Sequence, residues 1–173
     1  HVGVPRAVPK APLPRLDSGS EGTALYALLD TGCGCSLAGP AWHAQVGKEV
    51  LDRLGTRIET FPENRVFKFG PGTPFISTCA SVIPAGIGGC GVRLRFSQIA
   101  AVGAPPLLSR PALASLGCVI DVHSQTAVFE ALRRQPIEDD QIGVCQLFET
   151  TTGCLCLLLN DYRGRTEDRK STR

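Results

Sequence analysis

The sequence contains no methionine, one tryptophan and few other aromatic residues, and neither charge predominates. Eighteen basic and sixteen acidic side chains leave a net charge of +2, which does not indicate a surface for nucleic acid or for a membrane. The longest apolar run, CLCLLL at residues 154–159, is far shorter than the roughly 20 residues of a membrane-spanning helix. We therefore expect neither nucleic acid nor a membrane among the partners.

The first residues, HVGVPRAVPKAPLP, lack the apolar core of a secretory signal peptide, so we expect a cytoplasmic location. Methionine is missing even at position 1, which suggests a piece of a longer chain. The 43% of hydrophobic and 20% of charged residues are typical of a folded protein. A chain of this length buries roughly 70% of its unfolded surface, so it needs neither metal nor disulfides to fold.

Eight cysteines are the unusual feature of the composition. An even number would indicate disulfides in a small secreted protein, but this chain is longer than such scaffolds and has no export signal. The C-x-C pairs at Cys33/Cys35 and Cys154/Cys156 are weak zinc signatures, because structural zinc sites use wider spacings and further Cys or His ligands. We therefore expect free, mostly buried thiols, no metal and no other cofactor.

Hydrophobic periodicity divides the chain into a Pro-rich lead-in with a first turn (residues 1–22), a central domain (23–132) and a linker with a polar tail (133–173). The expected elements of the central domain are a strand over 23–29, a helix over 40–54, a hairpin with a Gly-rich tip at 70–72, strands over 80–87 and 92–99, a short helix after Ser109 and a hairpin over 119–129. The tail has the apolar residues for one more hairpin, over 144–159. The fold class is therefore mainly β, with one or two short helices.

The segment Ala27-Leu28-Leu29-Asp30-Thr31-Gly32 carries the most chemical information. An acidic residue directly after a buried apolar strand is costly to place unless it is hydrogen-bonded or functional. Gly32 permits a tight loop that brings backbone amides near the carboxylate, and the Thr31 hydroxyl can lock that loop. Taken alone, Asp-Thr-Gly also fits an ordinary turn at the end of a strand.

In context, this segment resembles the active-site loop of retropepsin-like aspartic proteases. Two further elements follow in that family's order. The hairpin tip Phe69-Gly70-Pro71-Gly72 resembles the flap that covers the substrate, and the segment from Pro106 to Asp121, with Leu108, Ser109 and Arg110 at its start, is similar to the family's strand and helix behind the catalytic loop. The resemblance spans residues 23–132. It implies one half of an acid protease with a closed, barrel-like β fold, and the chain's ends suit a fragment of a retrotransposon polyprotein.

The chain departs from the family's pattern at three positions. Ser109 stands where the family usually has Gly, and Cys33 stands where it has Ala or Ser. Gly34 replaces the acidic residue that partners the arginine matching Arg110. Arg110 therefore either ties the short helix to the catalytic loop or is a solvated side chain at a helix start.

Aspartic protease chemistry requires two carboxylates that share one proton, one acting as base on a water and the other as acid toward the carbonyl oxygen. This chain has one Asp-Thr-Gly. Asp17 precedes Ser-Gly between polar flanks and is interpreted as a turn residue, and Asp121 precedes Val-His and is interpreted as an ordinary strand-end acid. The resemblance therefore implies a homodimer in which Asp30 of each chain contributes to one site.

The leading hypothesis is thus a homodimeric aspartic endopeptidase that cleaves an extended polypeptide, with Asp30, Thr31 and Gly32 in the catalytic loop and a polyprotein as the substrate. The alternative is a catalytically inactive retropepsin-like module for dimerisation or peptide binding. A zinc-binding module built on the C-x-C pairs is a more remote third. His43 and Trp42, on the expected helix, are interpreted as packing residues.

Overall fold

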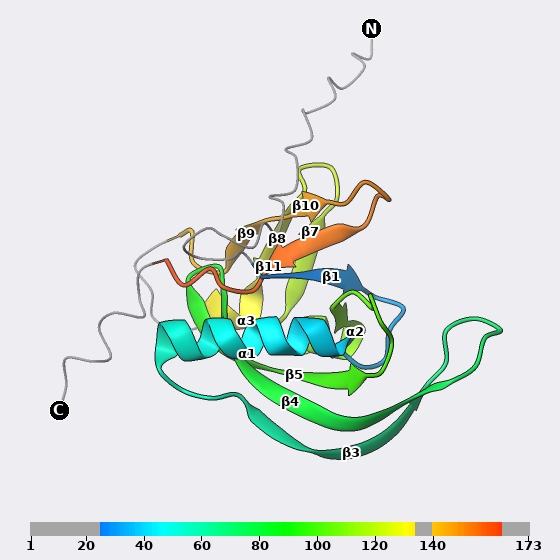
Figure 1. Ribbon diagram of the computed structural model, residues 1–173. Coiled ribbons are helices and arrows are strands. Elements are labelled where there is room, and N and C mark those ends of the chain that lie inside the picture. Colours follow the sequence, from blue (N-terminus) through cyan, green and yellow to red (C-terminus); the bar gives the residue numbers. More distant parts are fainter. Residues whose placement is uncertain (1–24, 134–139, 164–173) are drawn as a thin grey trace, which may run out of the picture.

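The computed structural model describes residues 25–133 and 140–163, so the expected lead-in over 1–22 lies outside the described residues. The described chain is mainly β, as expected (Figure 1). Its elements are, in order, β1 (Tyr26–Asp30), β2 (Leu37–Ala38), α1 (Pro40–Leu54), β3 (Glu59–Phe67), β4 (Phe75–Ile87), β5 (Cys90–Ile99), β6 (Leu107–Ser109), α2 (Arg110–Ser115), β7 (Cys118–Asp121), β8 (Thr126–Phe129), α3 (Glu130–Arg133), β9 (Val144–Gln146), β10 (Phe148–Glu149) and β11 (Leu155–Leu158).

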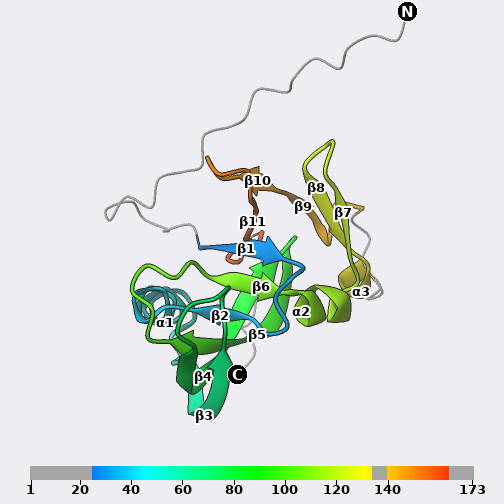
Figure 2. The ribbon, with the colours of Figure 1, turned by 90° about the vertical axis from the view of Figure 1, so that its right-hand side faces the viewer.

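The strands form two sheets. The larger has eight strands in the order β10-β11-β1-β6-β2-β5-β4-β3, with parallel pairs β1–β6 and β2–β5 among antiparallel ones. The smaller contains β7, β8 and β9, which lie side by side in Figure 2. Among the described residues, β10 and β3 end the larger sheet without pairing with each other. The sheet is therefore open and mixed, and the closed barrel that the resemblance implied is not observed.

Helix α1 begins and ends where the sequence predicts. Pro40 occupies its first turn, where a missing N–H costs nothing, and Gly55 ends it in the left-handed conformation (φ +63°) with its N–H donating to the Leu51 carbonyl at 2.9 Å. One face of the helix is buried, namely Trp42, His43, Val46 and Val50. This face packs against β4 and β5, and the Trp42 ring lies 4.7 Å from that of Phe96, so the expected core position of Trp42 is confirmed.

The hairpin that contains the Gly-rich tip is longer than the sequence pattern suggested. The expected strand over 80–87 is the second half of β4, which runs without interruption from Phe75. Strands β3 and β4 pair from Glu59↔Val82 to Phe67↔Phe75, with an irregularity between Pro62 and Arg65. The paired arms carry the tip, residues 68–74, beyond the edge of the core. Figure 1 shows the tip curving toward the end of the molecule where β1 ends.

The segment after residue 140 belongs to the sheets. Strand β11 pairs antiparallel with β1, with Tyr26 opposite Leu158, so the larger sheet extends well beyond residue 132, where the sequence pattern ended the central domain. Strands β10 and β11 pair across residues 150–154, as the expected hairpin requires. The first part of that expected hairpin is different, because β9 pairs with β8 in the smaller sheet. The chain changes sheet at Leu147, which is buried.

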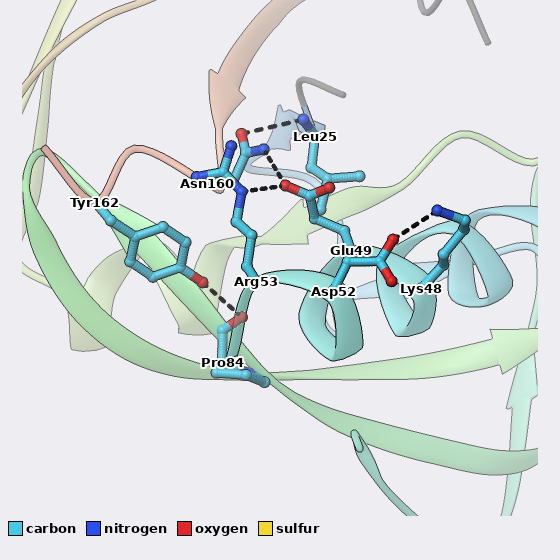
Figure 3. A network of polar contacts seen from close by, with 8 residues as sticks. All are labelled: Leu25, Lys48, Glu49, Asp52, Arg53, Pro84, Asn160 and Tyr162. Atoms are coloured by element: carbon cyan, nitrogen blue, oxygen red, sulfur yellow. Dashed lines mark hydrogen bonds and ion pairs between the residues drawn. The ribbon is translucent and has the colours of Figure 1, made fainter. Parts of the chain in front are cut away.

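A polar network holds this C-terminal segment against the start of β1 and the helix (Figure 3). The Leu25 N–H donates to Oδ1 of Asn160 at 3.2 Å, and Nδ2 of Asn160 donates to Oε1 of Glu49 at 3.2 Å. Arg53 donates to the same Glu49 oxygen at 2.5 Å from one turn along α1. One asparagine thus connects three elements that are far apart in the sequence.

Gly86 in β4 allows a close backbone contact with the same segment. A Cβ at this position would lie 2.8 Å from the Asp161 carbonyl and 2.7 Å from the Tyr162 ring, so any side chain would force the segments apart. The Gly86 N–H donates to the Leu159 carbonyl at 2.7 Å, and its own carbonyl accepts from Asp161 at 3.0 Å. The Tyr162 hydroxyl donates to the Pro84 carbonyl at 3.3 Å. The glycine therefore permits the C-terminal segment to close over β4.

His43 is a buried titratable residue, 5% exposed, and neither ring nitrogen has a hydrogen-bond partner among the described residues. Its expected role as a packing residue fits this position. Burial lowers the pKa of the imidazole below its usual value, and the nearby Ser97 backbone opposes part of that effect. The folded protein therefore holds His43 neutral at a pH where the unfolded chain already protonates it.

We expect this difference to make the free energy of unfolding fall as the pH drops below about 6.5, because only the unfolded chain then gains the proton. The contribution of His43 is at most about 1.4 kcal/mol per pH unit. His43→Phe should remove it, as measured by urea unfolding at pH 7.5 and 5.5. His123→Phe, which removes a histidine from an exposed turn between β7 and β8, is the matched control, and the loss of stability that His43 causes at low pH should persist in it. An unchanged pH dependence in His43→Phe would contradict the prediction.

Among the described residues, no helix has both the length and the apolar character to cross a membrane.

Candidate active site

The loop after β1 is a tight turn built around Asp30. Its carboxylate Oδ1 accepts the N–H of Gly32 at 2.9 Å, and its carbonyl accepts the N–H of Cys33 at 3.2 Å. Asp30 is half-buried, whereas Thr31 and Gly32 are exposed. The carboxylate is thus oriented by a backbone amide while the loop itself lies at the protein surface, where a second chain can reach it.

Strand β6 supports both ends of this loop. It lies between β1, which leads into the loop, and β2, which follows it. Its pairing is parallel to β1, with Ser109 opposite Asp30, and antiparallel to β2, with Leu107 opposite Leu37. Leu108 is fully buried in the main core. The segment that the resemblance placed behind this loop is therefore its direct neighbour in the sheet.

Ser109 stands where the resemblance to retropepsin-like proteases leads us to expect Gly. It makes hydrogen bonds to two different segments. Its N–H donates to the Ser36 hydroxyl at 3.0 Å, and that hydroxyl donates to the Ser109 hydroxyl at 3.1 Å. The Ser109 hydroxyl also accepts the Ala112 N–H at 3.4 Å and so caps α2. Both serines are buried. The pair links the far end of the loop to β6 and to the start of α2.

Arg110 meets the loop through its backbone. Its N–H donates to the Cys33 carbonyl at 3.1 Å. Its side chain is exposed and makes no hydrogen bond or ion pair within the described residues. This position fits the interpretation of Arg110 as a solvated side chain, and the described contact between helix and loop is made by the main chain. Gly34 is also exposed, and a Cβ there would meet no atom within 4 Å. A larger side chain would therefore fit at this position, and steric crowding is not the reason for the glycine.

A pocket of about 420 Å³ lies between this loop and the end of the β3–β4 hairpin. One wall comes from the loop and the other from the end of β3 and the residues after it, with Asp30, Gly32, Cys33, Gly34, Cys35, Arg65, Val66, Phe67, Lys68 and Phe69 as its lining. Of the expected flap residues Phe69, Gly70, Pro71 and Gly72, the pocket lining includes Phe69. The tip of the hairpin is held by Phe67, the last residue of β3, which packs with Leu37 and Ile99.

Two thiols of the loop line the pocket. The Cys33 thiol donates to the Cys35 carbonyl at 2.8 Å. Burial raises the pKa of Cys33, the backbone of Cys35 opposes part of this shift, and the neighbouring Asp30 carboxylate raises the pKa further, so Cys33 is a neutral thiol at neutral pH. The Cys35 sulfur instead accepts a hydrogen bond from Nη1 of Arg65 at 2.7 Å.

All eight cysteines are free. Burial raises the pKa of Cys118 and Cys156 to about 11 and that of Cys145 to about 12, which leaves these three thiols neutral and unreactive. Cys154 is exposed. The described residues contain no group of three Cys, His, Asp or Glu side chains placed to hold a metal ion.

The structure adds site residues that the sequence did not single out. Arg65 and Lys68 face the loop from β3 and the hairpin, and Ser36 braces it from behind. Arg65 lies 30 residues from Cys35 and Ser36 lies 73 residues from Ser109, so no local spacing connects the partners. No signal in a single sequence marks these contacts.

Comparison with known protein families and with curated proteins yields no match to this chain. The resemblance to retropepsin-like proteases therefore depends on the three motifs, their order and the residues quoted for them.

Proposed function

We propose that this protein is a homodimeric aspartic endopeptidase of the retropepsin-like type, in which Asp30 of each chain holds the catalytic water. The observation that carries the proposal is the pocket that has Asp30 on one wall and the end of the β3–β4 hairpin on the other. Its volume lies within the range of ligand-binding clefts. An extended polypeptide could lie there with the hairpin as its cover, making β-type hydrogen bonds to the protein.

The chemistry requires one proton shared by two carboxylates. The ionised Asp30 removes a proton from the water as its oxygen attacks the carbonyl carbon, and the protonated Asp30 of the other chain donates to the carbonyl oxygen. When the C–N bond breaks, the amine nitrogen takes up a proton from the dyad. Among the described residues, Asp30 is the one carboxylate in the pocket lining, so in this proposal the second comes from another chain.

The exposed loop supports this arrangement. The Thr31 hydroxyl makes no hydrogen bond within the described residues and is exposed, so it is available to the same residue of a second chain. The Ser36–Ser109 contact fixes the loop from inside each chain. We further propose that the substrate is the retrotransposon-type polyprotein from which the chain derives, processed in the cytoplasm.

A retropepsin-like module without catalysis is the second candidate, and the exposed Arg110 side chain, which has no ion pair within the described residues, favours it. An unfolded protein substrate, incubated with the purified chain at pH 4 to 7, separates the two. Cleavage that a statine-type transition-state analogue blocks and a metal chelator does not would support the endopeptidase. A dimer in sedimentation that binds peptide and cleaves none would support the module.

The hairpin tip offers a further prediction. Gly70 has φ +60°, a conformation that a β-branched residue strongly disfavours, whereas Gly72 has an ordinary φ and a Cβ there would be in normal contact with the Phe69 carbonyl at 3.7 Å. We expect Gly70→Val to lower kcat/KM at least about tenfold, because the tip must open and close over substrate.

Gly72→Val is the matched control and should reduce turnover far less. Both variants should remain folded, because the tip is exposed and outside the core, and the strain at position 70 should lower the melting temperature by only a few degrees. Equal losses of turnover in the two variants, or losses that follow melting temperature, would mean that the tip is a structural hairpin and not a flap.

A further inference from the structure

The guanidinium of Arg65 is held at the edge of the pocket by two contacts. Nη1 donates to the Cys35 sulfur at 2.7 Å, which joins β3 to the catalytic loop, and Nε lies 4.0 Å from Oε1 of Glu63. The Arg65 side chain remains 48% exposed. A guanidinium carries five N–H donors, so these contacts leave most of them free toward the pocket.

The charge of Arg65 is not cancelled by Glu63. That carboxylate is 6% exposed and makes its close ion pair with Arg95 at 2.6 Å, together with a hydrogen bond from the Ser77 hydroxyl. Glu63 therefore has two arginines near one negative charge. The nearer of them is Arg95. The positive charge of Arg65 is therefore only weakly compensated and acts on the pocket.

Lys68 adds a second positive charge to the same wall. It is exposed, lines the pocket, and makes no hydrogen bond or ion pair within the described residues. Of the residues that the structure describes, the opposite wall carries one acidic side chain, Asp30. In a working dyad two such carboxylates share a proton, so the pair contributes a single negative charge against an Arg and a Lys from each chain.

We infer that this wall is a specificity subsite for an acidic side chain, so that the preferred substrate is an extended polypeptide with Glu or Asp near the scissile bond. A carboxylate suits the planar fork of Arg65, and Lys68 adds an unpaired ammonium. The inference rests on the proposed endopeptidase function and names its substrate class.

Peptides that differ only by Glu, Gln or Lys at each position around one cleavage site test this inference. For the wild-type dimer we expect kcat/KM about tenfold higher for Glu than for Gln at one position, since a charge-assisted hydrogen bond is replaced by a neutral one. Affinities of the same peptides for the Asp30→Asn protein, measured by fluorescence anisotropy, should show the same order without any need for cleavage.

Two charge-reversal variants locate the effect. Lys68→Glu should abolish or reverse the preference in favour of Lys peptides, while Arg65 keeps its contact with Cys35. Arg57→Glu, at an exposed position outside the pocket, makes the same change in net charge and should keep the Glu preference.

The outcomes separate the two proposals. Cleavage with equal rates for Glu and Gln at every position would overturn the acidic subsite and leave the endopeptidase intact. A Glu preference in binding with no cleavage by the wild type would support the subsite and overturn the endopeptidase. A protein that neither binds nor cleaves any of the peptides would overturn both.

Discussion

Asp30→Asn is expected to lower kcat/KM for peptide cleavage by more than about a thousandfold, because an amide can neither take a proton from water nor share one with its partner. The fold and the dimer should remain, since the amide oxygen can still accept the Gly32 N–H that the carboxylate accepts at 2.9 Å. A fluorogenic peptide measures cleavage, and thermal unfolding with sedimentation measures the fold and the assembly.

Asp121→Asn is the matched control for the change of charge. Asp121 also follows an apolar strand and accepts backbone N–H groups, from His123 at 2.9 Å and Ser124 at 3.2 Å, but it lies on β7 and does not line the pocket. Its variant should retain wild-type activity. Residual cleavage by Asp30→Asn at a rate comparable to wild type would remove Asp30 from the mechanism.

The second large effect concerns assembly. Specific activity should fall as the protein is diluted, in step with the loss of dimer in sedimentation, because one chain brings one carboxylate to the pocket. Specific activity that stays constant where sedimentation shows monomer alone would refute the shared site. A second carboxylate within the chain would then have to be sought.

Mixing provides an independent measure of the shared site. When wild type and Asp30→Asn exchange freely at equal amounts, random pairing leaves about a quarter of the dimers with two Asp30 residues. Total activity should therefore drop to about half of what the same amount of wild-type protein shows before mixing. Mixing with Asp121→Asn should not lower it. Activity unchanged by Asp30→Asn, with exchange verified, would show that each chain works alone.

Much of the local structure could be predicted because its causes lie within a few residues. Helix α1 has the predicted bounds, since Pro40 and Gly55 act at its two ends through their own backbone preferences. Ser109 caps α2, as expected. The expected β7–β8 hairpin forms as well, with a turn over residues 122–125 that is one residue longer than the predicted turn over 123–125. The Asp30 turn also follows from its own residues, because Gly32 supplies the N–H that binds the carboxylate.

Which strands pair with each other in the sheets could not be predicted in this way. The period-two pattern of a strand indicates which side chains are buried and leaves its partner undetermined. Strand β11 could have formed a separate tail hairpin, yet it lies against β1, and the β1–β11 pairing is completed by Asn160 contacts to Leu25 and Glu49. The open form of the larger sheet likewise depends on which strands pair over long distances in the sequence.

By itself, then, the sequence determined helices α1 and α2, the main turns and the one acidic loop that carries a chemical hypothesis, because each depends on short-range backbone and hydrogen-bonding preferences. The short helix α3 was not predicted. Tertiary structure alone decided that β6 lies between the strands flanking that loop, that Ser36 meets Ser109, and that Arg65 reaches Cys35 across the pocket. These contacts join residues 30 or 73 positions apart, and the burial of the whole core brings them together.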